Sequence, residues 1–120
     1  MAQLITILWR DIPAQVTAKQ GRAKAAVQLT DRFQITIDLA AARASLETTD
    51  EYLAEWRRET TECSDDITTE ANDAAERLEA EFTEDFLREL VTTGGIRGGE
   101  YIERPDKRKR SDKFNKIEEE

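Results

Sequence analysis

The run Leu4–Trp9 limits the possible folds of this 120-residue chain more than any other segment. Its residues, Leu-Ile-Thr-Ile-Leu-Trp, place apolar side chains in both alternating positions, so an extended strand would be apolar on both faces. β-Branched and aromatic residues also favour strands. We therefore expect a central strand that is covered on at least one face. The run is far shorter than the roughly 20 apolar residues needed to cross a bilayer.

Two more strands are expected after this run. Asp11-Ile12-Pro13 is expected to end the first strand, because proline cannot donate a ladder hydrogen bond. Residues 15–19 alternate between apolar and polar side chains, and Gln20-Gly21-Arg22 is typical of a turn. Residues 22–29 alternate again, which favours a third strand. Their alanines also allow a helix, so this segment stays open between the two.

A helical period begins at Thr30 or Asp31, either of which can cap a helix that runs to about Leu46. Its apolar residues form two lines: Phe33, Ile37, Ala40, Ala41 and Ala44 in one, and Ile35, Leu39, Ala42 and Leu46 in the other. If both lines pack against other parts of the protein, most of the circumference of the helix is buried. We expect this helix to lie on the sheet.

Three shorter helices are expected in the following segment. Thr48 and Glu51 have the spacing of a capping box, and this helix would extend through Trp56, with Arg57-Arg58 near its C-terminal end. Residues 60–64 are interpreted as a polar break. The next helix begins at about Asp65. The last is capped by Thr83 and ends near Val91, with Phe82 and Leu87 at the spacing of a hydrophobic staple.

These elements predict an α+β fold, in which a small antiparallel sheet of two or three N-terminal strands packs against three or four helices. Residues 1–92 would form a single domain. Residues 93–120 would be a glycine-rich hinge followed by a charged, mobile tail, because glycine and charge dominate there.

Charge is unevenly distributed along the chain. Residues 31–91 hold eighteen acidic and six basic side chains, a net charge of −12, whereas the whole chain has a net charge of −8. Such acidity argues against general binding to nucleic acid or anionic membrane. The basic run Lys107–Arg110 leaves nucleic-acid binding through the tail as an alternative, although Glu118–Glu120 close the tail. The acidic middle segment favours instead an intramolecular contact with this run, or a solvated tail.

Few residues suggest catalysis. The chain has no histidine, which removes the most common general base and metal ligand. Cys63 is the only cysteine and is flanked by acids, which disfavour the thiolate. The acidic pairs of the chain lack the pattern of a calcium loop, and the glycines of 94–99 lack the Gly-Lys-Ser/Thr ending of a P-loop. We expect no catalytic residues, no metal and no cofactor, and lean away from an enzyme. The lone cysteine fits a reducing compartment, and with no secretory signal evident we expect the cytoplasm.

Two clusters of aromatic and charged residues suggest a binding surface. Trp9, Arg10 and Asp11 stand together at the end of the first strand, and Trp56 with Arg57 forms a second cluster. Tryptophan and arginine are enriched at the energetic centres of protein interfaces. The alternative is that Trp9 packs in the core while Arg10 and Asp11 pair locally. The sequence thus predicts another protein as partner, of unknown identity, with the oligomeric state left open.

The segments Met1–Val16, Gln20-Gly21-Arg22, Val27–Leu29, Arg32-Phe33 and Glu51–Arg58 resemble the small bacterial virulence factor domain family. A similar domain stands at the C-terminal end of larger proteins called conserved virulence factor C. The resemblance implies no catalytic residues. It implies a bacterial accessory or interaction domain. It also suggests, as an alternative, an accessory or carrier subunit in folate- and corrinoid-dependent methyl transfer.

Overall fold

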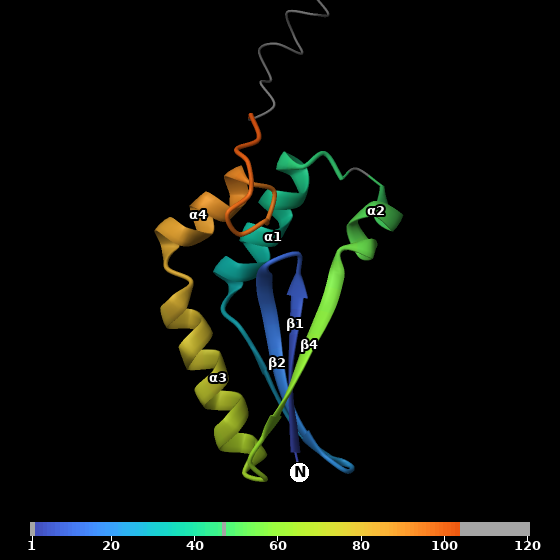
Figure 1. Cartoon of the computed structure of the whole chain (residues 1–120), viewed down its shortest axis with the longest axis vertical. Coiled ribbons are helices and arrows are strands. Elements are labelled where there is room, and N and C mark those ends of the chain that lie inside the picture. The colour runs from blue at the N-terminus through green and yellow to red at the C-terminus, as the bar shows by residue number, and fades with distance from the viewer. Residues whose placement is uncertain (1, 47, 104–120) are drawn as a thin grey trace, which may run out of the picture.

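The computed structural model describes residues 2–46 and 48–103. Its elements follow one another along the chain as shown in Figure 1: β1 (Ala2–Trp9), β2 (Ile12–Gln20), β3 (Ala23–Gln28), α1 (Asp31–Arg43), α2 (Thr49–Ala54), β4 (Trp56–Cys63), α3 (Ile67–Glu81) and α4 (Glu84–Thr92). The fold is α+β, as the sequence predicts. The basic run at 107–110 lies outside the described residues.

The sheet has four antiparallel strands in the order β3-β2-β1-β4, one more than expected. β1 is central, as its apolar run predicts, and pairs with β2 from Gln3↔Lys19 to Trp9↔Ile12. The turn between them is only Arg10 and Asp11, with Arg10 at a φ of 53°. β1 ends at Trp9, just before Asp11-Ile12-Pro13, as expected, but the second strand begins earlier than the alternation at residues 15–19 indicated, because Ile12 and Pro13 already belong to β2.

The fourth strand, β4, replaces the helix end and polar break expected at residues 56–64. Helix α2 stops at Ala54, and Trp56–Cys63 pairs with β1 without a shift in register, from Trp9↔Trp56 to Ala2↔Cys63. Helical spacing of Tyr52 and Trp56 suggested a continuous helix, but pairing with the free edge of β1 decides the conformation. Residues 22–29, left open above, form strand β3 within Ala23–Gln28.

Helix α1 is buried along one line only. Phe33, Ile37, Ala40 and Ala41 join the core, whereas Ile35 and Leu39 are 57% and 52% exposed. The expectation that most of the circumference is covered is therefore wrong. The helix also ends at Arg43 rather than Leu46. The other line stays exposed because the elements that α1 contacts, chiefly α4 and to a lesser extent β2, leave that side of the helix uncovered.

The predicted caps of the other helices are present. The side chain of Thr48 accepts a hydrogen bond from the backbone of Glu51 at the start of α2. Thr83 accepts one from Phe86 at the start of α4, and Phe82 and Leu87 on either side of that cap are buried. Helix α3 begins after Asp66, close to the expected start at about Asp65, and buries Ala71, Ala74 and Ala75.

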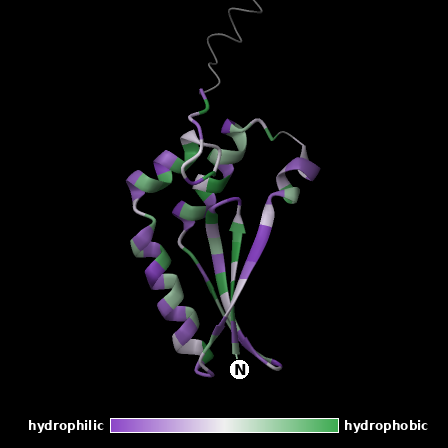
Figure 2. Cartoon of the chain, viewed as in Figure 1, coloured by the Kyte–Doolittle hydropathy of each residue, from purple (hydrophilic) through white to green (hydrophobic). Residues whose placement is uncertain are grey.

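The two faces of the sheet differ in which helices pack against them. Helix α3 contacts β1, β2 and β3, so it covers one face (Figure 1). Thr6 and Leu8 face α3, since they line a cleft together with Leu78 of that helix. Alternation along β1 therefore places Ile5 and Ile7 on the opposite face. Figure 2 shows β1 hydrophobic and β4 largely hydrophilic, consistent with a central and an edge strand.

Candidate functional site

The structure brings the five predicted partner-binding residues to one end of the sheet. Trp9 and Trp56 are cross-strand partners in β1 and β4. Arg57 Nε donates to the carbonyl of Arg10 over 2.9 Å, and its Nη2 donates to Asp11 Oδ1 over 2.9 Å. Two clusters that are more than forty residues apart in sequence are thus parts of one site.

Trp9 lies in the hydrophobic core directly below this site. Its side chain has no exposed surface, and its indole Nε1 donates to the carbonyl of Tyr52 over 2.9 Å. The Tyr52 ring stacks on the indole and meets Trp56 edge to face. The interpretation of Trp9 as a core residue is confirmed. Trp56 is half-buried. The aromatic residues therefore fix the end of the sheet, and the exposed groups around them are charged.

Arg10 is held in place by its neighbours and does not pair with Asp11. Its Nε binds Glu55 over 2.8 Å, and its Nη1 donates to the carbonyl of Gly94 over 3.0 Å. The guanidinium lies 5.3 Å from the Trp9 ring centre, within cation–π distance. The side chain is only 18% exposed, so Arg10 joins α2, the turn and the segment after α4.

Gly94 and Gly95 pack against the end of the sheet. The carbonyl of Gly95 accepts a hydrogen bond from the Asp11 backbone, and both glycines are buried with positive φ. A Cβ on Gly95 would come 2.9 Å from Cζ3 of Trp9. Glycine is needed here for close approach as well as for backbone conformation. The glycine pattern alone did not distinguish this role from a hinge.

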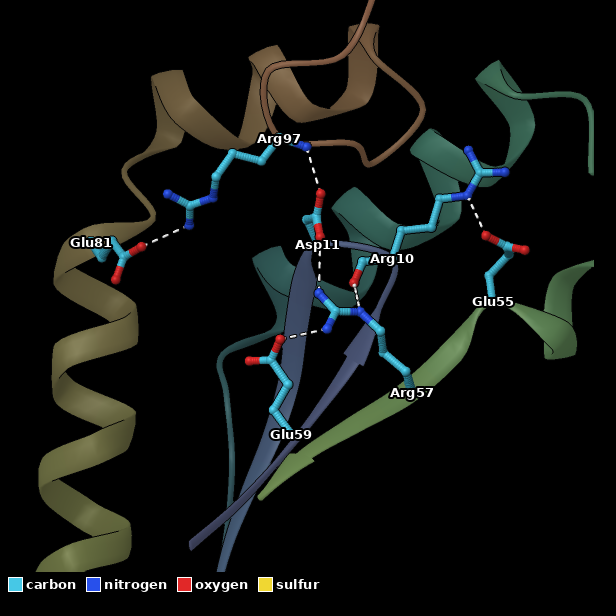
Figure 3. A network of polar contacts seen from close by, with 7 residues as sticks. All are labelled: Arg10, Asp11, Glu55, Arg57, Glu59, Glu81 and Arg97. Carbon is cyan, nitrogen blue, oxygen red and sulfur yellow. Dashed lines mark hydrogen bonds and ion pairs between the residues drawn. The ribbon is translucent and has the colours of Figure 1, made fainter. Parts of the chain in front are cut away.

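An open cleft of about 340 Å³ lies between this end of the sheet and the C-terminal end of α3. Five charged residues surround it, and we call them the charged cleft: Asp11, Arg57, Glu59, Glu81 and Arg97. Figure 3 shows how they come from the β1–β2 turn, β4, α3 and the segment after α4. Its apolar lining comes from Leu8, Pro13, Leu78 and Phe82.

Asp11 is the centre of the charged cleft. While Oδ1 accepts from Arg57, Oδ2 accepts from the backbone N–H of Arg97 over 2.7 Å. The Arg97 side chain continues to Glu81 over 2.7 Å and lies over the rings of Phe82 and Phe86. Hydrogen bonds from Arg57 to Glu59, and then to Asp11, raise the pKa of Arg57 above its ordinary value. Its guanidinium is therefore firmly charged.

The charged cleft holds groups of both signs in ion pairs with one another. Its two guanidiniums present planar donors, and its three carboxylates present acceptors, around an apolar floor. Cys63 lies at the far end of β4, opposite Ala2, and burial together with Glu70 and Asp65 raises its pKa. Among residues 2–46 and 48–103 no cluster of histidine, cysteine and acids could hold a metal ion. No helix in that part is long and apolar enough to span a membrane.

Several residues of the site were not predicted from the sequence. Glu55, Glu81 and Arg97 gave no local signal, because only the fold brings them to the turn. Glu59 stands two residues after Arg57, which places both on one face of a strand. An assignment of residues 56–63 as strand would have found it.

A protein-family model described as Virulence factor matches residues 7–91. The chain belongs to the virulence factor family. The matched segment of this virulence factor domain contains β2, β3, β4, part of β1, α1, α2, α3 and nearly all of α4. It includes four residues of the charged cleft but ends before Arg97. Comparison with curated proteins gave no match, and neither did comparison with solved structures.

Proposed function

We propose that this virulence factor domain is a non-enzymatic protein-interaction or accessory module of the bacterial cytoplasm, and that the charged cleft is its partner site. The supporting observation is the convergence of five charged side chains from four separate segments on one open cleft. Exposed ion pairs contribute only roughly 0–1 kcal/mol each to the stability of a fold. A need for stability therefore does not account for such a cluster.

The size and composition of the cleft favour side chains of a partner protein. About 340 Å³ is near the lower limit of small-molecule pockets, which are usually more apolar. The lining suits one or two long charged side chains whose stems rest on Leu8 and Phe82. Arg57 and Arg97 would bind a carboxylate, and Asp11 or Glu59 would bind a lysine or arginine.

The surrounding structure holds the charged residues before a partner arrives. Buried Trp9 and the Arg10–Glu55 pair fix the turn that carries Asp11, and Gly95 fixes the segment that carries Arg97. Less side-chain freedom is then lost on binding. This preorganisation supports a binding role for the predicted residues Arg10, Asp11 and Arg57, with Trp9 and Trp56 as their support.

Site-specific photo-crosslinking in the native bacterium tests the proposal. A photoreactive residue at position 57 or 97 is expected to capture the same protein, and the same residue at Arg88, which is exposed on α4, should not. Purified Arg57→Ala and Arg97→Ala chains should then bind that protein at least about tenfold more weakly, whereas Arg88→Ala should bind normally. Equal capture from all three positions, or equal affinity of all variants, would refute the charged cleft as the partner site.

A further inference from the structure

Strand β4 is an exposed edge of the sheet. Its eight residues pair with β1 on one side, and on the other side no backbone group of residues 57–63 has a hydrogen-bond partner within the described parts of the chain. Natural edges are commonly protected by charged side chains, proline, bulges or a covering element. β4 carries charges of both signs, Arg57, Arg58, Glu59 and Glu62. β4 contains no proline, its pairing with β1 has no bulge, and no helix packs on it substantially.

The side chains of β4 divide between the two faces of the sheet. Arg57 and Glu59 face α3, in the charged cleft. By alternation Arg58, Thr60 and Glu62 lie on the opposite face, next to Ile7, Ile5 and Gln3 of β1 in the same order. Arg58, Thr60 and Glu62 form no hydrogen bond or ion pair with other side chains described here, whereas Arg57 and Glu59 are paired. Charges on the outer face are thus available to a partner.

We propose that β4 pairs antiparallel with β4 of a second copy of this chain, centred on Thr60, so that Arg58 of each copy faces Glu62 of the other. The two sheets would become one continuous sheet of eight strands. This inference is independent of the charged cleft, because its deciding residues lie on the other face of the strand.

Symmetry leaves few possible registers. Two identical antiparallel edge strands in one sheet are related by a twofold axis perpendicular to the sheet, which keeps each face on its own side. Residues directly opposite each other must therefore share a face. It follows that one residue of β4 lies opposite its own copy, and the choice of this residue fixes every other pair.

Charge then selects one of these registers. Centring on Arg58 would place Arg57 opposite Glu59, but these two already bind each other within one copy, and the two Arg58 side chains would lie opposite each other. Centring on Glu59 would place two glutamates opposite each other. Like charges directly opposite each other are destabilising. Centring on Thr61 would place Glu62 opposite Thr60 and form no ion pair. Only centring on Thr60 combines a Thr–Thr pair, which is favourable across strands, with two Arg58–Glu62 ion pairs. Centring on Thr60 is therefore the register that forms two ion pairs without placing like charges opposite each other.

Substitutions that reverse the charge of Arg58 or Glu62 test whether β4 is the dimer interface and whether the pairing is centred on Thr60. The full chain is expected to sediment as a monomer–dimer equilibrium at micromolar concentrations. Arg58→Glu would place two glutamates opposite each other at both ends of the pairing, and Glu62→Arg would place two arginines opposite each other there. Each single variant should dimerise at least about tenfold more weakly, since two attractive pairs become repulsive.

Mixing the two monomeric variants should restore the dimer, because each copy then meets the opposite charge at both positions. Lys24→Glu, on the opposite edge strand β3, is the matched control and should dimerise like the parent chain. Circular dichroism confirms that each variant is folded. A parent chain that stays monomeric, a dimer that survives both single variants, or a mixture that remains monomeric would each overturn the proposal.

Discussion

Cζ3 of Trp9 and the Cα of Gly95 are so close that no side chain larger than hydrogen fits between them: a Cβ would approach the ring to 2.9 Å. The contact joins the central strand to the segment that follows α4. It also positions the carbonyl of Gly95 to accept a hydrogen bond from the backbone N–H of Asp11. The geometry of the turn thus depends on a residue more than eighty positions later in the chain.

Gly95→Ala should destabilise the domain by about 2–4 kcal/mol, because it adds a clash with buried Trp9 to the strain of a positive φ. Gly21→Ala is the matched control. Gly21 has a φ of +59°, but a Cβ there would meet nothing within 4 Å. We expect it to cost only about 1 kcal/mol. Urea unfolding of both variants measures the difference, and equal losses would show that the contact with Trp9 is unimportant.

The two apolar lines of α1 should respond differently to substitution. Ile37 is completely buried, so Ile37→Ala is expected to cost about 2–5 kcal/mol of unfolding free energy. Leu39 is half exposed, so Leu39→Lys should change it by less than about 0.5 kcal/mol. Chemical denaturation compares them directly. A large loss for Leu39→Lys would mean that something covers this side of α1.

Glu79 should make the stability of the domain sensitive to acid. Burial raises the pKa of this carboxyl, but hydrogen bonds from the Thr30 backbone, the Arg32 guanidinium and the Thr30 hydroxyl outweigh it, so the pKa is lowered overall. A lowered pKa means that the ionised form stabilises the fold above the pKa of the unfolded chain. This contribution is lost as the pH falls through the pKa of the folded chain.

Glu79→Gln should therefore flatten the fall in unfolding free energy as the pH is lowered below about 5, since the glutamine cannot titrate. Glu76→Gln, an exposed position on the same helix, is the control and should leave the slope of the parent chain. Denaturant unfolding over this pH range gives both slopes. Parallel slopes for the parent chain and Glu79→Gln would contradict the prediction.

The charged cleft should contribute little to stability. Arg57 and Asp11 are 43% and 31% exposed, so a double-mutant cycle with alanine should give a coupling of about 0.2–1 kcal/mol that decreases with added salt. The more exposed pair Arg88–Glu84, at 3.9 Å, should give a smaller coupling. A strong coupling between Arg57 and Asp11 would assign the cleft to folding rather than to binding.

The sequence predicted the parts of the fold that local pattern determines. The apolar run of β1, the alternation of β2 and the caps Thr48 and Thr83 all rest on neighbouring residues. Strand β4 was missed because Trp56–Cys63 has no alternation of apolar and polar side chains, and its conformation comes from pairing with β1. The exposure of Ile35 likewise depends on how many elements surround α1, which periodicity does not specify.

The candidate site was predicted in part for the same reason. Residue types favoured at interfaces singled out Arg10 and Arg57, Asp11 was named because it follows Arg10 at the end of the strand, and the fold brings all three together. Glu81 and Arg97 required the packing of α3 and the glycine-rich segment against the sheet. Whether these residues bind a partner stays a prediction until the experiments above are done.

The position of Arg97 after the matched segment 7–91 has a consequence for comparing relatives of this domain. The family signature identifies the scaffold and three sides of the cleft, while the fourth side comes from sequence that the signature does not include. Under the proposed binding role, two relatives that share every element of the fold would select different partners through the few residues that follow the last helix.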